Sequence, residues 1–172
     1  MVYVVLDLSI SICPLLNGGG QESDKRSTTE NLAGIAATAK ALRLSMENLE
    51  TFTTRTSKMK EIILEELAKY PDVTIFSGIE NFAPHILTFG IKGVRGEVVV
   101  HAFEEYDIYI STTSACSSKA GKPAGTLIAM GVEKSLAQTA VRISLDADND
   151  MSQMEQFLTT FKIIYEKTRK VR

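Results

Sequence analysis

The residues best suited to chemistry lie in one short segment around a single cysteine. Cys116 stands among small, polar and turn-forming residues in the stretch STTSACSSKAGKP, which joins a β-branched run to a helical one. This composition predicts a mobile, exposed loop over residues 111–124. Lys119 and Lys122 would favour the thiolate, the nucleophilic form of a cysteine. A lone cysteine is also often a small buried apolar residue, so the segment by itself leaves both interpretations open.

The spacing of the histidines and glycines along the sequence does not match known metal or nucleotide sites. His85 and His101 are the only histidines, and their distances along the chain from each other and from the cysteines fit no familiar zinc pattern. The glycines Gly18–Gly20 precede Gln, Glu and Ser, which matches neither a dinucleotide fingerprint nor a P-loop. We therefore expect no metal site and no nucleotide site of these kinds.

Composition and charge narrow the class of protein further. The chain has 172 residues, 44% of them hydrophobic, which suffices for a compact domain with a core. Its net charge of -2 comes from interspersed acids and bases, so neither nucleic acid nor a membrane is an expected direct partner. No apolar run reaches about 18 residues, and the start of the chain lacks a signal-peptide pattern. With only two cysteines, we expect a cytoplasmic protein.

The elements that would position the loop begin with a strand and a long helix. Residues 6–12 alternate apolar and polar side chains, which predicts a half-buried strand, and Gly18–Gly20 predict a turn. Ser27 and Glu30 form a capping-box pattern, followed by apolar residues at helical spacing up to Pro71. We expect one very long helix over residues 28–70, or two helices with a break between Thr53 and Ser57.

Beyond Pro71 the pattern predicts a small α/β (α+β) domain. Its sheet would be mostly antiparallel, with helices on one face. The final helix is expected to start at a second capping box formed by Ser152 and Glu155. The expected strands are Val73–Phe76, Ile86–Ile91, Ile108–Ser111 and Val141–Leu145, and the shorter expected helices are Gly96–Tyr106 and Gly125–Met130.

The strand over residues 6–12 has no neighbouring strand in the sequence with which to pair. An unpaired apolar strand promotes association, so we expect a dimer partner or the chain's own small sheet to cover it. The chain therefore looks like a piece of a larger protein.

Three separated motifs resemble the class V aminotransferase-like cysteine desulfurases, which are pyridoxal-phosphate enzymes of fold type I. GGGQE at residues 18–22, continuing to RSTTEN at residues 26–31, resembles the family's GGGQE...RSGTEN block. SACSS at residues 114–118 is similar to its active-site loop, and VRISL at residues 141–145 to its RISL strand. The resemblance covers about residues 13–168 and identifies the chain as a C-terminal fragment.

The resemblance implies roles for three residues. Cys116 would be the catalytic cysteine that takes sulfur from L-cysteine as a persulfide and leaves L-alanine. Arg142 would bind the substrate carboxylate; strand alternation places it opposite Val141 and Ile143, although an ordinary surface ion pair would produce the same pattern. Thr29 would contact the cofactor phosphate of a neighbouring subunit from the first turn of a capped helix, although it could simply cap that helix.

The resemblance also implies domains and partners. Residues 1–27 would be a remnant of the large cofactor-binding domain, 28–70 the linking helix and 71–172 the small domain. The family's Schiff-base lysine has no counterpart in residues 1–17, so we expect this chain alone to bind pyridoxal phosphate weakly and to be inactive. Expected partners are L-cysteine, a second copy, a sulfur-acceptor or iron-sulfur scaffold protein and a separate N-terminal half; the sulfur would serve iron-sulfur cluster assembly or tRNA thiolation.

The sequence differs from the family motifs at two positions, and two alternative functions remain open. Thr28 and Thr113 stand where the family commonly has glycine, and threonine resists positive φ. A related class V enzyme, such as a selenocysteine lyase or an aminotransferase, is one alternative function. A non-enzymatic persulfide acceptor or dimerising module is the other.

Overall fold

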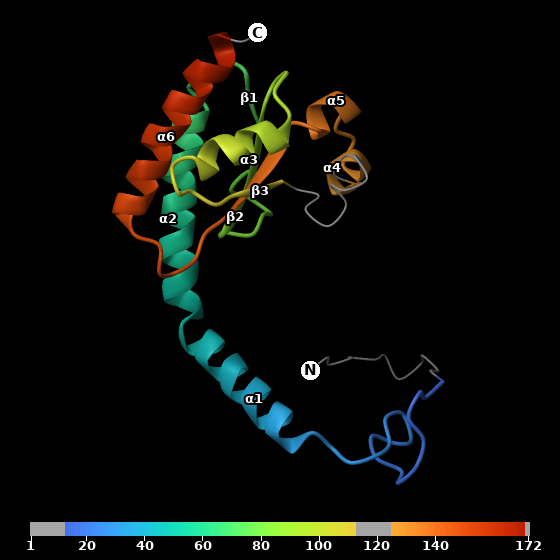
Figure 1. Ribbon diagram of the computed structural model, residues 1–172. Helices are drawn as coiled ribbons and strands as arrows, with labels where there is room; N and C mark the ends of the chain where they lie inside the picture. Colours follow the sequence, from blue (N-terminus) through green and yellow to red (C-terminus); the bar gives the residue numbers. More distant parts are fainter. Residues whose placement is uncertain (1–12, 113–124, 171–172) are drawn as a thin grey trace. The chain divides into compact units, whose positions relative to one another are not determined.

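The computed structural model describes residues 13–112 and 125–170, and the chain divides into two compact units, residues 1–49 and 50–172 (Figure 1). The expected strand over residues 6–12 and the segment that contains Cys116 lie outside the described residues. The elements in chain order are α1 (Leu32–Glu47), α2 (Leu49–Leu67), β1 (Val73–Ile75), β2 (Ile86–Ile91), α3 (Gly96–Glu104), β3 (Ser111–Thr112), α4 (Gly125–Ala129), α5 (Lys134–Ala137), β4 (Ala140–Ser144) and α6 (Met151–Lys170).

The glycine-rich segment of the first unit forms the turn that its sequence predicts. Gly18, Gly19 and Gly20 all have positive φ, at 130°, 35° and 77°. Glycine has no Cβ, so it adopts these backbone angles without a steric penalty. The turn returns the chain on itself, because the Ser27 backbone N–H donates to the Leu16 carbonyl at 3.2 Å and Ser27 is buried.

The capping box expected at Ser27 and Glu30 is wrong. Helix α1 starts at Leu32, and Asn31 caps it by accepting a hydrogen bond from the Gly34 N–H at 3.0 Å. Asparagine is as good an N-cap as serine, and Ser27 is already part of the preceding turn.

The helix break is also displaced from its expected place between Thr53 and Ser57. It falls at Asn48, whose backbone N–H and side-chain Nδ2 both donate to the Leu44 carbonyl. Thr56 instead remains helical, because its hydroxyl donates back to the Phe52 carbonyl at 2.8 Å.

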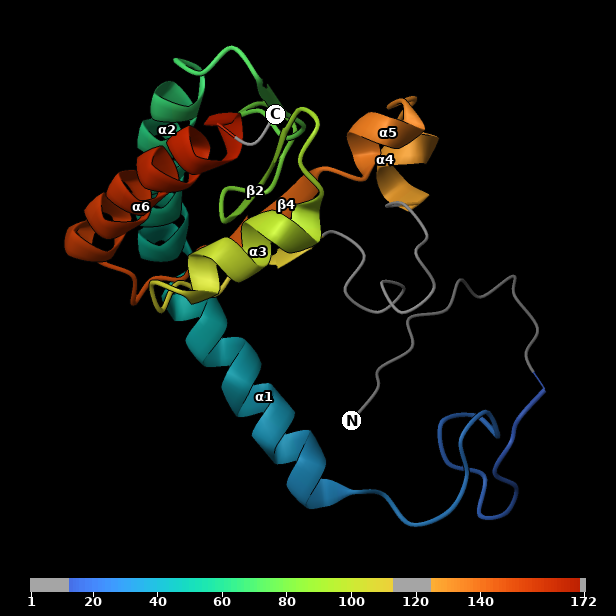
Figure 2. The ribbon, with the colours of Figure 1, turned by 45° about the horizontal axis from the view of Figure 1, so that its top comes forward.

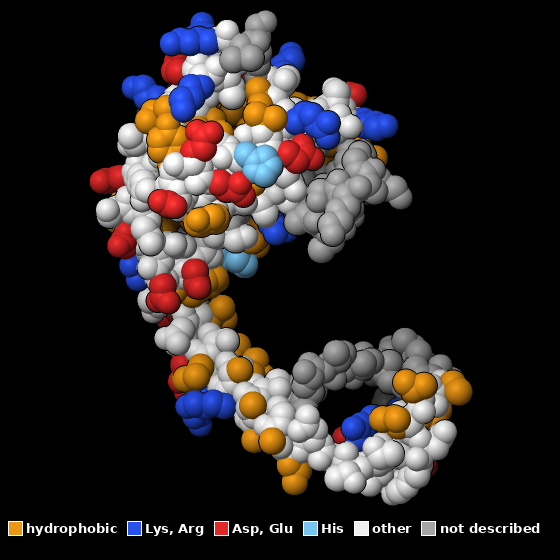
Figure 3. All heavy atoms as spheres, in the orientation of Figure 1, with side chains coloured by type: hydrophobic (Ala, Val, Ile, Leu, Met, Phe, Trp, Pro, Cys, Tyr) orange, Lys and Arg blue, Asp and Glu red, His pale blue; other side chains and the backbone are white. Residues whose placement is uncertain are grey.

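Helix α1 is apolar around most of its circumference, yet none of its residues is buried. Only Lys40, Arg43 and Glu47 carry charge among its 16 residues. Leu32, Leu42 and Met46 are 73%, 62% and 61% exposed, and Figure 3 shows apolar side chains along this helix. A helix of this composition is normally surrounded by other protein.

The second unit contains a four-stranded sheet of order β1-β2-β4-β3 in which every pairing is antiparallel. This confirms the expected small antiparallel sheet. Strand β2 runs over the expected residues, whereas β3 is reduced to Ser111 and Thr112.

The three longest helices of this unit, α2, α3 and α6, cover one face of the sheet (Figure 2). Strand alternation sends Leu87, Phe89 and Ile91 of β2 and Val141 and Ile143 of β4 into the same core. The helices contribute Met59, Ile63, Leu67, Val99, Phe103, Met154, Phe157, Phe161 and Ile164. Phe161 lies at the centre, with ring centroids 5.7 Å from Phe89 and 5.1 Å from Tyr70. Burial of these side chains is the main source of stability for the unit.

The N-cap of helix α6 is Asp150, two residues before the expected cap, Ser152. The reciprocal hydrogen bonds of the capping box join Asp150 and Gln153, with the Gln153 N–H donating to Asp150 Oδ1 at 2.8 Å and the Asp150 N–H to Gln153 Oε1 at 3.2 Å. The expected pair, Ser152 and Glu155, lies inside the helix. No helix among the described residues is both long enough and apolar enough to span a membrane.

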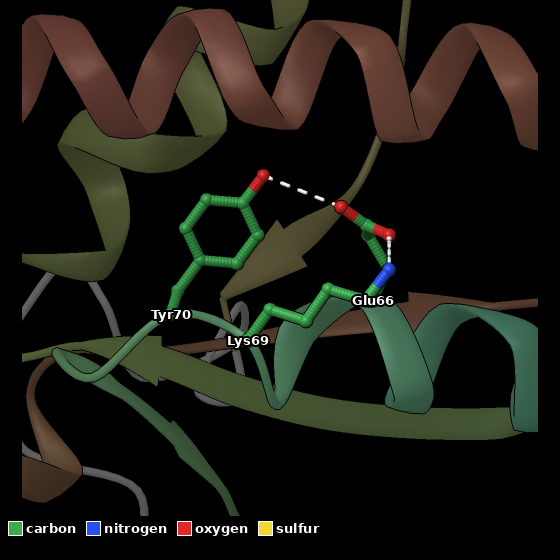
Figure 4. A network of polar contacts seen from close by, with 3 residues as sticks. All are labelled: Glu66, Lys69 and Tyr70. Atoms are coloured by element: carbon green, nitrogen blue, oxygen red, sulfur yellow. Dashed lines mark hydrogen bonds and ion pairs between the residues drawn. The ribbon is translucent and has the colours of Figure 1, made fainter.

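The C-terminal end of α2 is fixed by a small polar network (Figure 4). Lys69 Nζ donates to Glu66 Oε2 at 2.6 Å, and the Tyr70 hydroxyl donates to Glu66 Oε1 at 3.4 Å. The hydrogen bond from Lys69 lowers the pKa of the Glu66 carboxyl. The Tyr70 ring also contacts the Phe161 and Tyr165 rings, so the network joins the helix end to the core.

A lysine is buried on the core side of α2. Lys60 is 2% exposed and its Nζ donates to the Ala83 carbonyl at 2.9 Å, above the Phe82 ring. Burial away from water lowers the pKa of Lys60. This contact holds the loop between β1 and β2 against α2.

Candidate functional site

Arg142 lies on the sheet face opposite the main core. Val141 and Ile143, its neighbours on β4, are buried at 0% and 6% exposure in that core, so alternation turns Arg142 the other way. The expected alternation of this strand is therefore confirmed. The central position of β4 gives Arg142 a cross-strand neighbour on each side, Thr88 on β2 and Ser111 on β3.

The Arg142 guanidinium has an unused donor. Its Nε is buried and finds no hydrogen-bond partner among the described residues. A buried donor of a charged group that is left without an acceptor costs on the order of 1–3 kcal/mol. The site therefore favours an acceptor such as a carboxylate, for which the guanidinium fork is geometrically suited.

Thr88 and Ser77 support the site, and the sequence alone did not single them out. Both are largely buried, and the Thr88 N–H donates to Ser77 Oγ at 2.7 Å. This bond fixes the β2 backbone directly opposite Arg142. The only signal in the sequence was the polar residue Thr88 within an otherwise apolar strand. The sequence did not show that this strand pairs with the one that carries Arg142.

Thr29 lies before α1 and not in its first turn, which corrects the expected position. The helix starts three residues later, and Asn31 takes the capping role. The exposed Thr29 carbonyl accepts from Arg26 Nη1 at 3.1 Å, and the same nitrogen donates to the Thr28 carbonyl at 3.1 Å. Arg26 thus fixes the local backbone, but the first-turn N–H groups of α1 give no argument for an anion at Thr29.

The preceding residue, Thr28, has a φ of 81°. The expected conflict between threonine and positive φ is therefore present at this position. A β-branched residue in this region carries backbone strain.

Cys116 lies outside the described residues, but both ends of its segment are described. On one side the chain leaves β3 at Thr112, which pairs with Val141. On the other side α4 and α5 pack in a small apolar cluster in which Leu127 and Ala137 contact Ala140 of β4. The elements on both sides of the segment therefore contact β4, the strand that carries Arg142.

The described residues contain no group of three or more His, Cys, Asp or Glu side chains that could hold a metal ion. His85 contacts the Phe52 ring, with centroids 5.2 Å apart, and His101 pairs with Glu104 at 2.7 Å.

The chain is similar in sequence to proteins of one known family. Residues 9–157 match the family model described as aminotransferase class-V. The chain is 47% identical over 161 residues to a NifS/IcsS protein homolog of Lactobacillus delbrueckii subsp. bulgaricus. It is 30% identical over 166 residues to the cysteine desulfurase IscS of Clostridium botulinum. The matches cover 93% and 94% of this chain but only 42% of each relative.

Solved structures agree on the fold. A NifS-like protein matches with a TM-score of 0.75 at 30% identity, over 92% of this chain and 40% of that one. The NifS-like protein of Rickettsia africae matches with a TM-score of 0.72 at 30% identity, over 91% of this chain and 41% of that one. The expected fold-type-I small-domain architecture is confirmed by these neighbours.

Proposed function

The chain belongs to the aminotransferase class-V family, and from this premise we propose that it is the sulfur-accepting part of a cysteine desulfurase. It spans 42% of the length of its curated relatives, so the activity belongs to an assembly that includes the rest of the parent protein. In that assembly Cys116 accepts the sulfur and Arg142 holds the substrate. The assembly is a cytoplasmic homodimer in this proposal.

The proposed reaction moves one sulfur atom. The Cys116 thiolate attacks the sulfur of bound L-cysteine, an S–S bond forms and the Cβ–S bond of the substrate breaks. The substrate carbon takes up a proton and leaves as L-alanine, while Cys116 becomes a persulfide. The persulfide then passes its outer sulfur to an acceptor or iron-sulfur scaffold protein, for cluster assembly or tRNA thiolation.

The pairing of Ser111 with Arg142 is the observation that carries this proposal. Cys116 is the fourth residue after Thr112, and a fully extended chain covers at most about 3.6 Å per residue. The length of the chain between them therefore limits the distance between the two Cα atoms to roughly 14 Å. A nucleophile tethered beside the carboxylate-binding arginine can reach a substrate held there.

Arg142 would orient the substrate by its carboxylate. Its buried Nε lacks an acceptor among the described residues, and a bound carboxylate would supply one. Thr88, whose backbone N–H donates to Ser77 Oγ, lies directly across from Arg142 on the neighbouring strand.

The described residues do not make a pyridoxal phosphate site by themselves. Thr29 is the one position whose motif match suggests a phosphate contact, and its single exposed hydroxyl cannot hold a cofactor. The resemblance implies that the parent enzyme uses pyridoxal phosphate, which would serve as the electron sink for breaking the substrate Cβ–S bond. We propose that Thr29 contributes to the phosphate end of a site completed by the remaining polypeptide.

The apolar surface of α1 supports a complementing partner. None of its side chains is buried, although its composition is that of an enclosed helix. We propose that the remaining part of the parent protein, the lysine-bearing half, covers this surface. Mass spectrometry of Cys116 after incubation with L-cysteine, with and without that half, tests the proposal: persulfide should form only in the complemented sample.

A further inference from the structure

A pocket in the second unit lies outside the site described above. It has a volume of about 220 Å³ and opens beside the start of α6, the middle of α2 and the segment that leads into β3. Sites for drug-sized ligands usually have volumes of about 300–1,000 Å³. This pocket is therefore suited to a single side chain.

The floor of the pocket is apolar. Met59 and Ile63 of α2 and Met154 and Phe157 of α6 line it, and all four belong to the main core. An aliphatic chain placed on this floor would leave water and gain roughly 25 cal/mol per Å² of buried apolar area.

The rim of the pocket is acidic. Asp107 and Asp150 line it, and no lysine, arginine or histidine among residues 13–112 and 125–170 does. Asp150 is engaged in the cap of α6 through Oδ1, whereas the Asp107 carboxylate has no ion-pair or hydrogen-bond partner in the part of the chain that the structure describes. The unpaired Asp107 carboxylate at the edge of an apolar floor favours a cationic head group.

The N-terminal end of α6 lies at the pocket, but it does not make the pocket a binding site for an anion. The capping box between Asp150 and Gln153 satisfies backbone N–H groups at this end, and the Asp150 carboxylate offsets the positive end of the helix dipole. A cation near Asp107 is therefore compatible with the helix.

An aromatic ring completes the rim. Tyr109 lines the pocket and is 78% exposed. Exposed tyrosines are common in protein interfaces, and an aromatic face attracts a guanidinium more strongly than a compact ammonium. We propose that this pocket binds an arginine side chain of a partner protein, with its aliphatic part on the Met59 floor and its guanidinium between Asp107 and Tyr109. This proposal is independent of the sulfur chemistry.

The test is an NMR titration of the ¹⁵N-labelled chain with N-acetyl-L-arginine methylamide. The uncharged citrulline analogue is the matched control ligand. Arginine should shift amide signals of residues 107–110 and 149–157, and citrulline should bind at least about fivefold more weakly. Equal binding of the two ligands, or shifts confined to other residues, would overturn the proposal.

Variants sharpen the test. Asp107 has a φ of 57°, which asparagine tolerates, so Asp107→Asn should keep the fold and weaken arginine binding at least about fivefold. Asp148→Asn removes an exposed carboxylate outside the lining and should leave binding unchanged. Tyr109→Leu should lower the preference for arginine over the lysine analogue; a lysine analogue that binds wild type as tightly as arginine would contradict the arginine assignment.

Discussion

Ser111 of β3 and Arg142 of β4 face each other across an antiparallel pair, so the strand that leads into the cysteine segment is hydrogen-bonded beside the arginine. Thr88 of β2 lies on the other side of Arg142 in the same register. The strand that carries Arg142 is thus paired directly with the strand after which the segment containing Cys116 begins.

Arg142→Gln should lower kcat/KM for L-cysteine about 10- to 100-fold in the complemented enzyme, because a charge-assisted hydrogen bond to the carboxylate is lost. Steady-state alanine release measures this effect. Arg142→Lys should recover only part of the activity, since a lysine lacks the bidentate fork. The control is Arg55→Gln, at an exposed position of α2, and equal losses in the two glutamine variants would refute the substrate role.

Thr28→Gly should stabilise the turn before α1 by about 1 kcal/mol, because glycine adopts the observed φ of 81° without strain. Amide hydrogen exchange reports the change locally: exchange of the Ser27 N–H, which bonds the Leu16 carbonyl, should slow about fivefold. Thr29→Gly, where φ is not positive, should not slow it. Unchanged or faster exchange in Thr28→Gly would show that this position is not strained.

Phe161→Ala should destabilise the second unit by about 3–5 kcal/mol, because it opens a cavity at the centre of the core. Phe161 is 0% exposed and contacts the Phe89, Tyr70, Phe157 and Tyr165 rings. Urea unfolding followed by circular dichroism measures the loss. Ile163→Ala, two residues further along α6 at 40% exposure, should cost much less. Similar losses in both variants would be inconsistent with the described core.

Lys60→Met should stabilise the chain at pH 7, because it removes a charge that burial disfavours. The pKa of Lys60 is lower in the folded state than its ordinary 10.5, so the unfolded chain binds more protons between those two pKa values. Wild-type stability should therefore rise with pH through that interval, and the advantage of the variant should shrink. Denaturant unfolding of both proteins between pH 7 and 10.5 checks this; an advantage that grows with pH would contradict the sign.

Local patterns predicted the elements that a single stretch of sequence marks clearly. The apolar run Ile86–Ile91 became β2 with the expected bounds, and the expected final helix became α6, whose buried residues include Met154, Phe157 and Phe161. Period-two alternation also placed Arg142 opposite Val141, because only the orientation of one strand was needed.

The errors arose where several residues compete for the same role. Asn31 and Ser27 are both good caps, and the turn at Gly18–Gly20 decided between them by burying Ser27. Asp150 and Ser152 competed in the same way at α6. The support of Arg142 by Thr88 and Ser77 depends on long-range strand pairing, which no local pattern encodes.

The central claim is tested most directly by sulfide release from L-cysteine in the presence of pyridoxal phosphate and dithiothreitol. The chain would be assayed alone and then mixed with the part of the 47%-identical Lactobacillus relative that lies outside the match. Activity is expected only in the mixture and should be lost in Cys116→Ser, but not in Cys13→Ser, in which the exposed Cys13 is replaced. Full activity of the mixture with Cys116→Ser would contradict the account.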